Sequence, residues 1–200
     1  MIKNIIFDMG NVLLDFNPQV PLDEFCTCPQ SRDIIRRELF GGEEWIKRDL
    51  GLISVDELYS SCAERVPSEF HAQLRKCVDC WDICMVPLPY AKEFVEYAKN
   101  QGYGIYILSN ASDDFYRYFP RHFDLSVFDG IVVSADVHLI KPHKEIYLYL
   151  LEKYGLNPQE CLFIDDREDN VQGAKAVGMQ SIRFENDFAA VKDFLDKSFS

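Results

Sequence analysis

The 200-residue sequence has no long hydrophobic run and little positive charge. No stretch approaches the roughly 18 consecutive apolar residues of a membrane-spanning helix, and the N-terminus leads into a strand pattern without a signal-peptide pattern. Lys and Arg number 21 against 33 Asp and Glu, a net charge of -12, which would repel nucleic acid and anionic membrane surfaces. We therefore expect a cytoplasmic protein with neither as a partner.

The sequence also lacks the paired cysteines of a disulfide framework. Its seven cysteines are an odd number at scattered positions, which is typical of a reducing compartment. Cys77, Cys80 and Cys84 have helical spacing, but a structural zinc site needs four ligands, usually from two pairs, and no second pair has matching spacing. We interpret them as buried thiols on one helix face.

Apolar residues, in contrast, are abundant: 48% hydrophobic content is enough for one well-buried core with an insertion. The apolar run from Ile5 to Phe7 ends at Asp8, followed by Gly10 and Asn11. Such a run predicts a strand covered by helices on both faces, and ligands bind beyond the carboxyl ends of such strands. Taken alone, a single Asp after a strand is more typical of a turn or helix cap, so the prediction depends on the remaining chain.

Beyond residue 90, helical and strand patterns alternate. Strands are predicted at 103–108, 130–134, 161–164 and 180–184, with helices at 90–100, 114–119, 141–154 and from Asn170 to 178. This order predicts an α/β fold, a doubly wound parallel sheet. Residues 16–89 show only helical patterns, including a capping box at Ser54 and Glu57. We expect a core of residues 1–15 and 90–200 and an all-helical insertion of residues 16–89.

Polar side chains follow several of the predicted strands or begin the helices after them. They are Asp8, Ser109, Asn110, Lys141, Asp165 and Asp166. Clustered carboxylates repel one another without a cation, and a site with oxygen ligands suits Mg²⁺. A lysine and a hydroxyl group beside that metal suit a phosphoryl group. The sequence therefore predicts a Mg²⁺ and phosphate site in which Asp8 is the nucleophile.

Four motifs in this order resemble those of the haloacid dehalogenase superfamily, most of whose members are Mg²⁺-dependent phosphatases. They are residues 7–12, 108–110, 141–142 and 163–166. The resemblance covers the whole chain and implies a Rossmann-like core with a helical cap inserted after the first strand. The form Asp8-Met9-Gly10-Asn11-Val12, the stretch 49–54 and Asp169-Asn170 further resemble the bacterial α-D-glucose-1-phosphate phosphatase branch.

The resemblance implies a role for each matching position. Asp8 forms an aspartyl phosphate, and Ser109 and Lys141 hold phosphoryl oxygens, with Asn110 beside them. Asp166, Asp8 and the Gly10 carbonyl bind Mg²⁺, and Asp165 is a further ligand or holds a water molecule. The expected substrate is a small phosphorylated metabolite. The sequence assigns no oligomeric state.

One position departs from the superfamily pattern: Gly10 stands where most of its phosphatases have an acid/base Asp. Without that help, typically worth about 10²–10⁴ in rate, poor leaving groups suffer most, which favours sugar 1-phosphates and acyl phosphates. Another base must then activate water, and the sequence places neither Asp15 nor His143 in the site. The alternatives are a catalytically weak phosphate- and metal-binding regulatory protein, or a metal-independent haloacid dehalogenase, against which the Asp165-Asp166 pair argues.

Three further residues keep two interpretations each. Asn170 lies four residues after Asp166 and either holds an acid or caps its helix. Trp45 and Arg48, about one helical turn apart, either face a sugar or belong to the core of the insertion.

Overall fold

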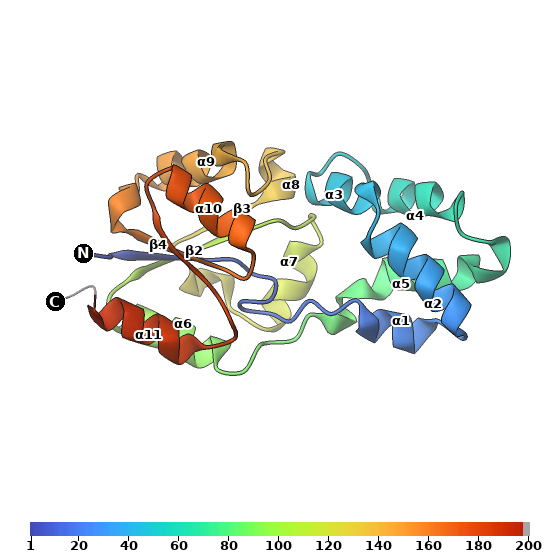
Figure 1. Ribbon diagram of the computed structural model, residues 1–200, viewed down its shortest axis with the longest axis horizontal. Helices are drawn as coiled ribbons and strands as arrows, with labels where there is room; N and C mark the ends of the chain where they lie inside the picture. Colours follow the sequence, from blue (N-terminus) through green and yellow to red (C-terminus); the bar gives the residue numbers. More distant parts are fainter. Residues whose placement is uncertain (198–200) are drawn as a thin grey trace.

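The computed structural model describes residues 1–197, in which five parallel strands form one sheet with the order β3-β2-β1-β4-β5 (Figure 1). The strands are β1 (Asn4–Phe7), β2 (Gly104–Ser109), β3 (Gly130–Val133), β4 (Cys161–Asp165) and β5 (Gln180–Arg183). The predicted doubly wound parallel sheet is confirmed, and β1 is its central strand. The strand that delivers Asp8 therefore pairs on both sides, with β2 and β4.

Helices cover both faces of the sheet, on opposite sides in Figure 1. They are α6 (Ala91–Asn100), α7 (Phe115–Tyr118) and α11 (Phe188–Lys197) on one face and α9 (Lys144–Tyr154) and α10 (Glu168–Ala176) on the other, with the short α8 (Ser134–Val137) after β3. Ile5 and Phe7 belong to the first apolar cluster and Ile6 to the second. The continuous apolar run of β1 is explained by this burial on both faces.

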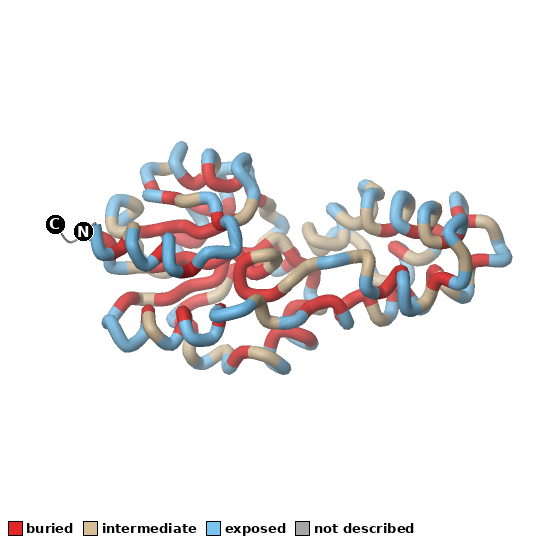
Figure 2. The backbone as a smooth tube through the Cα atoms, turned by 60° about the horizontal axis from the view of Figure 1, so that its bottom comes forward, coloured by how far each residue is buried: buried red, intermediate tan, exposed pale blue. Residues whose placement is uncertain are grey.

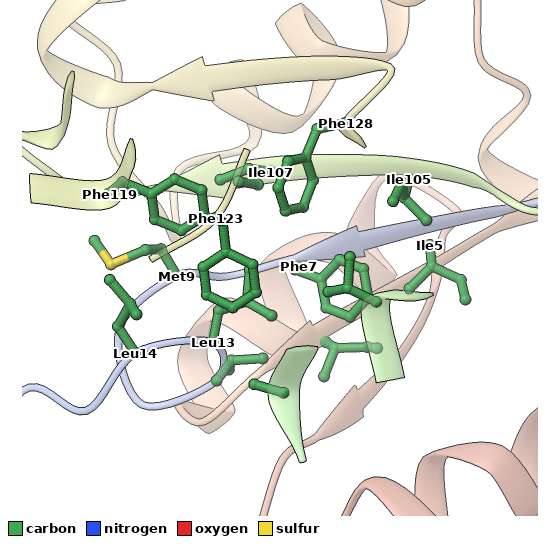
Figure 3. Close-up of a cluster of buried hydrophobic side chains, with 14 of the residues drawn as sticks. Ile5, Phe7, Met9, Leu13, Leu14, Ile105, Ile107, Phe119, Phe123 and Phe128 are labelled. Carbon is green, nitrogen blue, oxygen red and sulfur yellow. The ribbon is translucent and has the colours of Figure 1, made fainter. Parts of the chain in front are cut away.

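The loop after β1 is anchored by its own apolar side chains. Met9, Leu13 and Leu14 are buried, and Figure 3 shows them beside Phe7 in the cluster that also contains Phe119, Phe123 and Phe128. The amides of Leu13 and Leu14 both donate to the Met9 carbonyl, at 2.9 Å. Asp8 therefore stands on a loop that packing and hydrogen bonds fix.

All helices of the insertion between β1 and β2 lie within residues 19–84. They are α1 (Gln19–Phe25), α2 (Pro29–Ile35), a π-helical turn (Arg36–Phe40), α3 (Glu43–Asp49), α4 (Val55–Ala63), a 3₁₀ turn (Ser68–Phe70), α5 (His71–Cys80) and a second 3₁₀ turn (Trp81–Cys84). The capping box of Ser54 and Glu57 is present. These helices form a cap that extends from one end of the sheet (Figure 1) and contains buried segments of its own (Figure 2). Its buried residues include Leu22, Ile35, Leu58 and Leu74. The expected helical insertion is confirmed.

Two details differ from the sequence predictions. Lys141 does not begin a helix: the His143 amide donates to the Ile140 carbonyl in a turn, at 3.1 Å, and α9 starts at Lys144. In addition, α11 was not predicted, although its buried Phe188, Val191 and Leu195 follow a helical period. The remaining short 3₁₀ turns are Phe119–Arg121, Leu125–Val127 and Pro158–Glu160.

The cysteines form no disulfide, and all seven thiols are free. Cys77 and Cys84 are buried as expected, but α5 ends at Cys80, so the three thiols do not share one helix. Among residues 1–197, no cysteine belongs to a group of three or more potential metal ligands. Within the same range, no helix is long and apolar enough to span a membrane.

Candidate active site

The sheet topology brings the polar residues at the strand ends together at one edge. Asp8 follows β1, Ser109 ends β2 and Asp165 ends β4. Because Phe7 pairs with Ile107 on one side and Ile164 on the other, these three positions lie at nearly the same level. The Asp8 amide extends the ladder by donating to the Ile164 carbonyl at 2.8 Å. Parallel pairing therefore creates the site that the sequence predicts.

Lys141 lies at the centre of this site. Its ammonium group is 2.8 Å from Asp8 Oδ1 and 2.7 Å from Asp165 Oδ2, and its side chain is 0% exposed. Burial alone would lower the pKa of Lys141, but the carboxylates of Asp165 and Asp8 raise it overall. Lys141 is therefore a buried cation that holds two acids in place.

The acids themselves differ in their surroundings. Burial raises the pKa of Asp8, Lys141 opposes this, and Asp165 and Asp166 add to it. Asp165 is completely buried and accepts hydrogen bonds from the Arg167 amide (2.9 Å) and the Asn170 side chain (3.0 Å). Asn170 therefore holds Asp165 in place, which is one of the two roles that the sequence left open for it.

Asp8, Asp165 and Asp166 each place a carboxylate oxygen within 4.8 Å of the others. Asp166 is half-buried, and its pKa is raised by burial and by Asp165, against a 3.1 Å hydrogen bond from the Asn11 side chain. One lysine cannot neutralise three acids, so the arrangement fits a divalent cation with oxygen ligands. Asp8 and Asp166 border the cavity described below and are the acids best placed to bind it, whereas Asp165 is enclosed by protein donors.

Ser109 and Asn110 follow one another at the end of β2 but face different partners. Ser109 is completely buried, and its Oγ has no hydrogen-bond partner among residues 1–197. A buried hydroxyl group without a partner is unfavourable, and an oxygen of a bound phosphoryl group would satisfy it. The Asn110 side chain instead bonds the main chain of Lys141, accepting from its amide (2.9 Å) and donating to its carbonyl (3.0 Å). Asn110 thus fixes the turn that carries Lys141.

A cavity of about 660 Å³ opens above these groups, between core and cap. Its core side includes Asp8, Gly10, Lys141 and Asp166, and its cap side is largely aromatic. The aromatic residues are Phe16, Phe40, Trp45 and Trp81, with Tyr118 of the core beside them. Neighbouring rings are in contact, with centroids 5.3 Å apart for Trp45 and Trp81 and 5.2 Å for Trp81 and Tyr118. The volume suits a small ligand.

Besides the contact of Trp81 with Tyr118, the cap touches the core near this cavity through the end of α3 and the turn that follows it, residues 48–51, which we call the docking turn. Arg48 forms an ion pair with Asp113 of the core. Ser134, directly after β3, donates from its hydroxyl to the Asp49 carbonyl, and His138 Nδ1 lies 2.8 Å from the Leu50 carbonyl. The docking turn thus joins the end of α3 to the α8 segment of the core.

The structure separates the remaining candidates. Trp45 lines the cavity, whereas Arg48 is engaged by the core and lines a different recess with Asp113. His143 borders the cavity and is exposed at the start of α9. Asp15 lies in a neighbouring recess lined also by Asn11 and Asp166.

Gly10 leaves open space where a side chain would stand. A Cβ atom there would meet only Phe16 Cβ, at 3.8 Å, which is ordinary van der Waals contact. Sequence reasoning missed Asp49, the acid at the end of α3, which also borders the cavity. The stretch 49–54 was noted only for its resemblance, and no local pattern assigns Asp49 a role, because its position depends on how the cap docks.

Comparison with known proteins agrees with this architecture and places the chain in a family. A model of haloacid dehalogenase-like hydrolases matches residues 2–178, and the chain belongs to that family.

Individual relatives carry several activities. The sesquiterpene phosphatase astK of Aspergillus oryzae is 29% identical over 94% of this chain and 92% of its own length. The (S)-2-haloacid dehalogenase 4A of Burkholderia cepacia is 30% identical over an aligned region that makes up 48% of this chain and 42% of that protein. Among solved structures, a family enzyme of Bacteroides thetaiotaomicron in complex with magnesium and inorganic phosphate has a TM-score of 0.74 at 22% identity, covering 96% of this chain and 99% of that one. At that identity the structural match establishes the shared fold.

Proposed function

We propose that this hydrolase is a Mg²⁺-dependent phosphatase that hydrolyses a small phosphorylated metabolite through an aspartyl phosphate on Asp8. The observation that carries the proposal is the convergence of three carboxylates, a buried lysine and an unpartnered serine hydroxyl group at one sheet edge. The phosphatase activity of astK and the magnesium and phosphate bound in the Bacteroides structure support it.

Each residue has a defined part in this reaction. Asp8 Oδ1 accepts hydrogen bonds from the Met9 amide (2.6 Å) and from Lys141, which orients the carboxylate for attack on phosphorus. Lys141 and the Ser109 hydroxyl group bind phosphoryl oxygens, and Asn110 positions Lys141. Asp8, Asp166 and the Gly10 carbonyl would hold Mg²⁺, with Asp165 behind them. When bound, the cation supplies charge neutralisation for the acids and the phosphoryl group.

For the substrate we propose a sugar phosphate, such as a sugar 1-phosphate. The absent carboxylate at Gly10 favours a leaving group that departs readily. The resemblance to the glucose-1-phosphate phosphatase branch points the same way, and the aromatic side of the cavity offers Trp45 and Trp81 to the apolar face of a sugar ring.

A second candidate substrate is a phosphate ester with an apolar, terpenoid leaving group. It is favoured by the cap side of the cavity, where aromatic rings predominate and Ile46 and Met85 add apolar surface. The sesquiterpene phosphatase astK, which the chain covers almost completely, gives this candidate a precedent.

Dehalogenation is the competing reaction within the family. A dehalogenase nucleophile needs no metal, whereas three carboxylates within 4.8 Å repel one another unless a cation lies between them. Resistance of the activity to a chelator would support dehalogenation.

The test is phosphate release from sugar 1-phosphates, sugar 6-phosphates, acetyl phosphate and farnesyl phosphate, with Mg²⁺ and with EDTA. We expect turnover that requires Mg²⁺ and is abolished by Asp8→Asn. The matched control is Asp15→Asn, which changes a neighbouring acid outside the cavity and should keep most of the activity. Absence of release from every substrate, or equal release by Asp8→Asn, would refute the proposal.

A further inference from the structure

The chemistry proposed above needs a proton donor and later a base, and no carboxyl group stands at position 10 of the core to serve as either. Gly10 has no side chain. Three acids line the cavity, Asp8, Asp49 and Asp166. Asp8 has the role of nucleophile, and Asp166 belongs to the cluster of three acids proposed to bind the cation. The acid that remains is Asp49, which the cap contributes.

Asp49 lies over the same cavity as the nucleophile. Tyr118 lines the cavity too, and its pKa is raised by burial and then by the carboxylates of Asp49, Asp114 and Asp8. The Tyr118 phenol is thus within electrostatic reach of both Asp49 and Asp8. A leaving group that extends from phosphorus into the cavity would therefore occupy a space that both acids border.

The docking turn holds Asp49 in this position. The Asp49 carbonyl accepts from Ser134, the Leu50 carbonyl faces His138, and Arg48 pairs with Asp113. Gly51 lies directly against the core, with a left-handed φ of +67°, and a Cβ there would approach the Ala135 carbonyl oxygen to 2.5 Å. These contacts engage the main chain and Arg48, so the Asp49 carboxyl group is not used for docking.

The surroundings of Asp49 suit proton transfer. Burial raises the pKa of Asp49 to about 7, although the charge of Arg48 on the same helix acts to lower it. That charge is partly neutralised by Asp113 and Asp114 of the core. From the core, the phenol of Tyr118 also interacts electrostatically with Asp49. An acid with a pKa near the working pH can both donate and accept a proton.

We propose that Asp49 is the general acid and base of this site, in place of the side chain absent at Gly10; this inference rests on the proposed phosphatase function. As the Asp8 oxygen forms its bond to phosphorus, the bond from phosphorus to the leaving oxygen breaks, and that oxygen takes the proton of Asp49 to leave as an alcohol. The Asp49 carboxylate then takes a proton from water as the water oxygen attacks phosphorus. The Asp8–phosphorus bond breaks, which releases phosphate and restores protonated Asp49.

The test compares single-turnover rates of the wild type with Asp49→Asn, which keeps the size of the side chain but cannot exchange the proton. We expect a loss of about 10²–10³ in phosphoryl transfer from an alkyl or sugar phosphate, and little loss with p-nitrophenyl phosphate, whose leaving group needs no proton. With p-nitrophenyl phosphate, Asp49→Asn should give a burst of one p-nitrophenol per site and then stall as the aspartyl phosphate accumulates.

Two variants complete the test. Asp79→Asn, which changes an exposed cap acid on α5 outside the cavity, should behave like the wild type. Adding Gly10→Asp to Asp49→Asn should restore hydrolysis of the aspartyl phosphate, because the position has room for a side chain. The rate of that hydrolysis in the wild type should fall below about pH 7, where Asp49 is protonated.

The outcomes separate the two proposals. If the wild type turns over but Asp49→Asn loses no more than Asp79→Asn with every leaving group, the role of Asp49 is refuted while the phosphatase stands. If Asp49→Asn slows good and poor leaving groups equally, without a burst, Asp49 acts only on folding or docking and the inference is again refuted. A wild type without turnover would overturn both proposals.

Discussion

Replacing Lys141 with Met should reveal how strongly this lysine stabilises the site. The substitution removes a cation lying 2.8 Å from Asp8 and 2.7 Å from Asp165 and leaves two buried carboxylates without it. Breaking such a buried pair costs about 3–5 kcal/mol. For a chain of this size each kcal/mol lowers Tm by about 2–4 °C, so we expect a fall of roughly 6–20 °C at pH 8 without metal.

The same reasoning predicts how this loss depends on conditions. Lowering the pH to 5 should reduce it, because burial already raises the pKa of Asp8 and the variant can protonate its carboxylates instead of burying their charge. Mg²⁺ should also restore part of the stability by lying among the three acids.

Thermal unfolding followed by circular dichroism, with and without Mg²⁺ at both pH values, measures these effects. The matched control is Lys144→Met, the same change at an exposed lysine three residues away, which should shift the free energy of unfolding by less than about 0.5 kcal/mol. A Tm loss for Lys141→Met that equals the control, or that is the same at pH 5 and pH 8, would refute the electrostatic argument.

Three further predictions concern single side chains. Ser109→Ala should leave Tm unchanged or slightly raised, since the hydroxyl group has no partner, but should weaken inhibition by inorganic phosphate, measured as Ki. In urea unfolding, the free energy of unfolding of Asp49→Asn should match that of the wild type at pH 4 and exceed it by about 1–3 kcal/mol at pH 8. The reason is that folding raises the pKa of Asp49 to about 7, so the wild type loses stability as the pH rises from 4 to 7, whereas the variant does not. Gly51→Ala, strained by a φ of +67° and by the Ala135 carbonyl oxygen, should cost about 1–3 kcal/mol and lower kcat; an unchanged kcat would contradict a role for the docking turn in catalysis.

The sequence predicted the core of the site because its chemistry follows from strand order. Buried apolar runs ending in Asp8, Ser109 and Asp165 could meet only at the carboxyl edge of a parallel sheet, and the structure places them there. The adjacent acids of Asp165 and Asp166 indicated a cation, and their cluster with Asp8 agrees with that expectation.

What the sequence could not reveal depends on contacts between distant segments. Asn110 was expected beside phosphate and lines the cavity, but the sequence could not reveal that both polar atoms of its side chain bond the main chain of Lys141, 31 residues away. Asp49 begins the stretch 49–54 noted for its resemblance, but the sequence assigned it no role, because its position follows from contacts of the cap with Ser134 and His138, more than 80 residues further along. The exact borders of the cap and the role of each site residue stay predictions.

The contacts of the docking turn also bear on the speed of the enzyme. At about 1 kcal/mol each, the two hydrogen bonds and the Arg48–Asp113 ion pair of the docking turn favour the docked cap by roughly 2–4 kcal/mol. By themselves they would leave roughly one molecule in thirty to one in a thousand open at any moment. If the proposed products, alcohol and phosphate, are released through that rare population, their release is slow. Steady-state kcat should then report cap opening, fall as solvent viscosity rises, and differ little between substrates whose single-turnover rates differ widely.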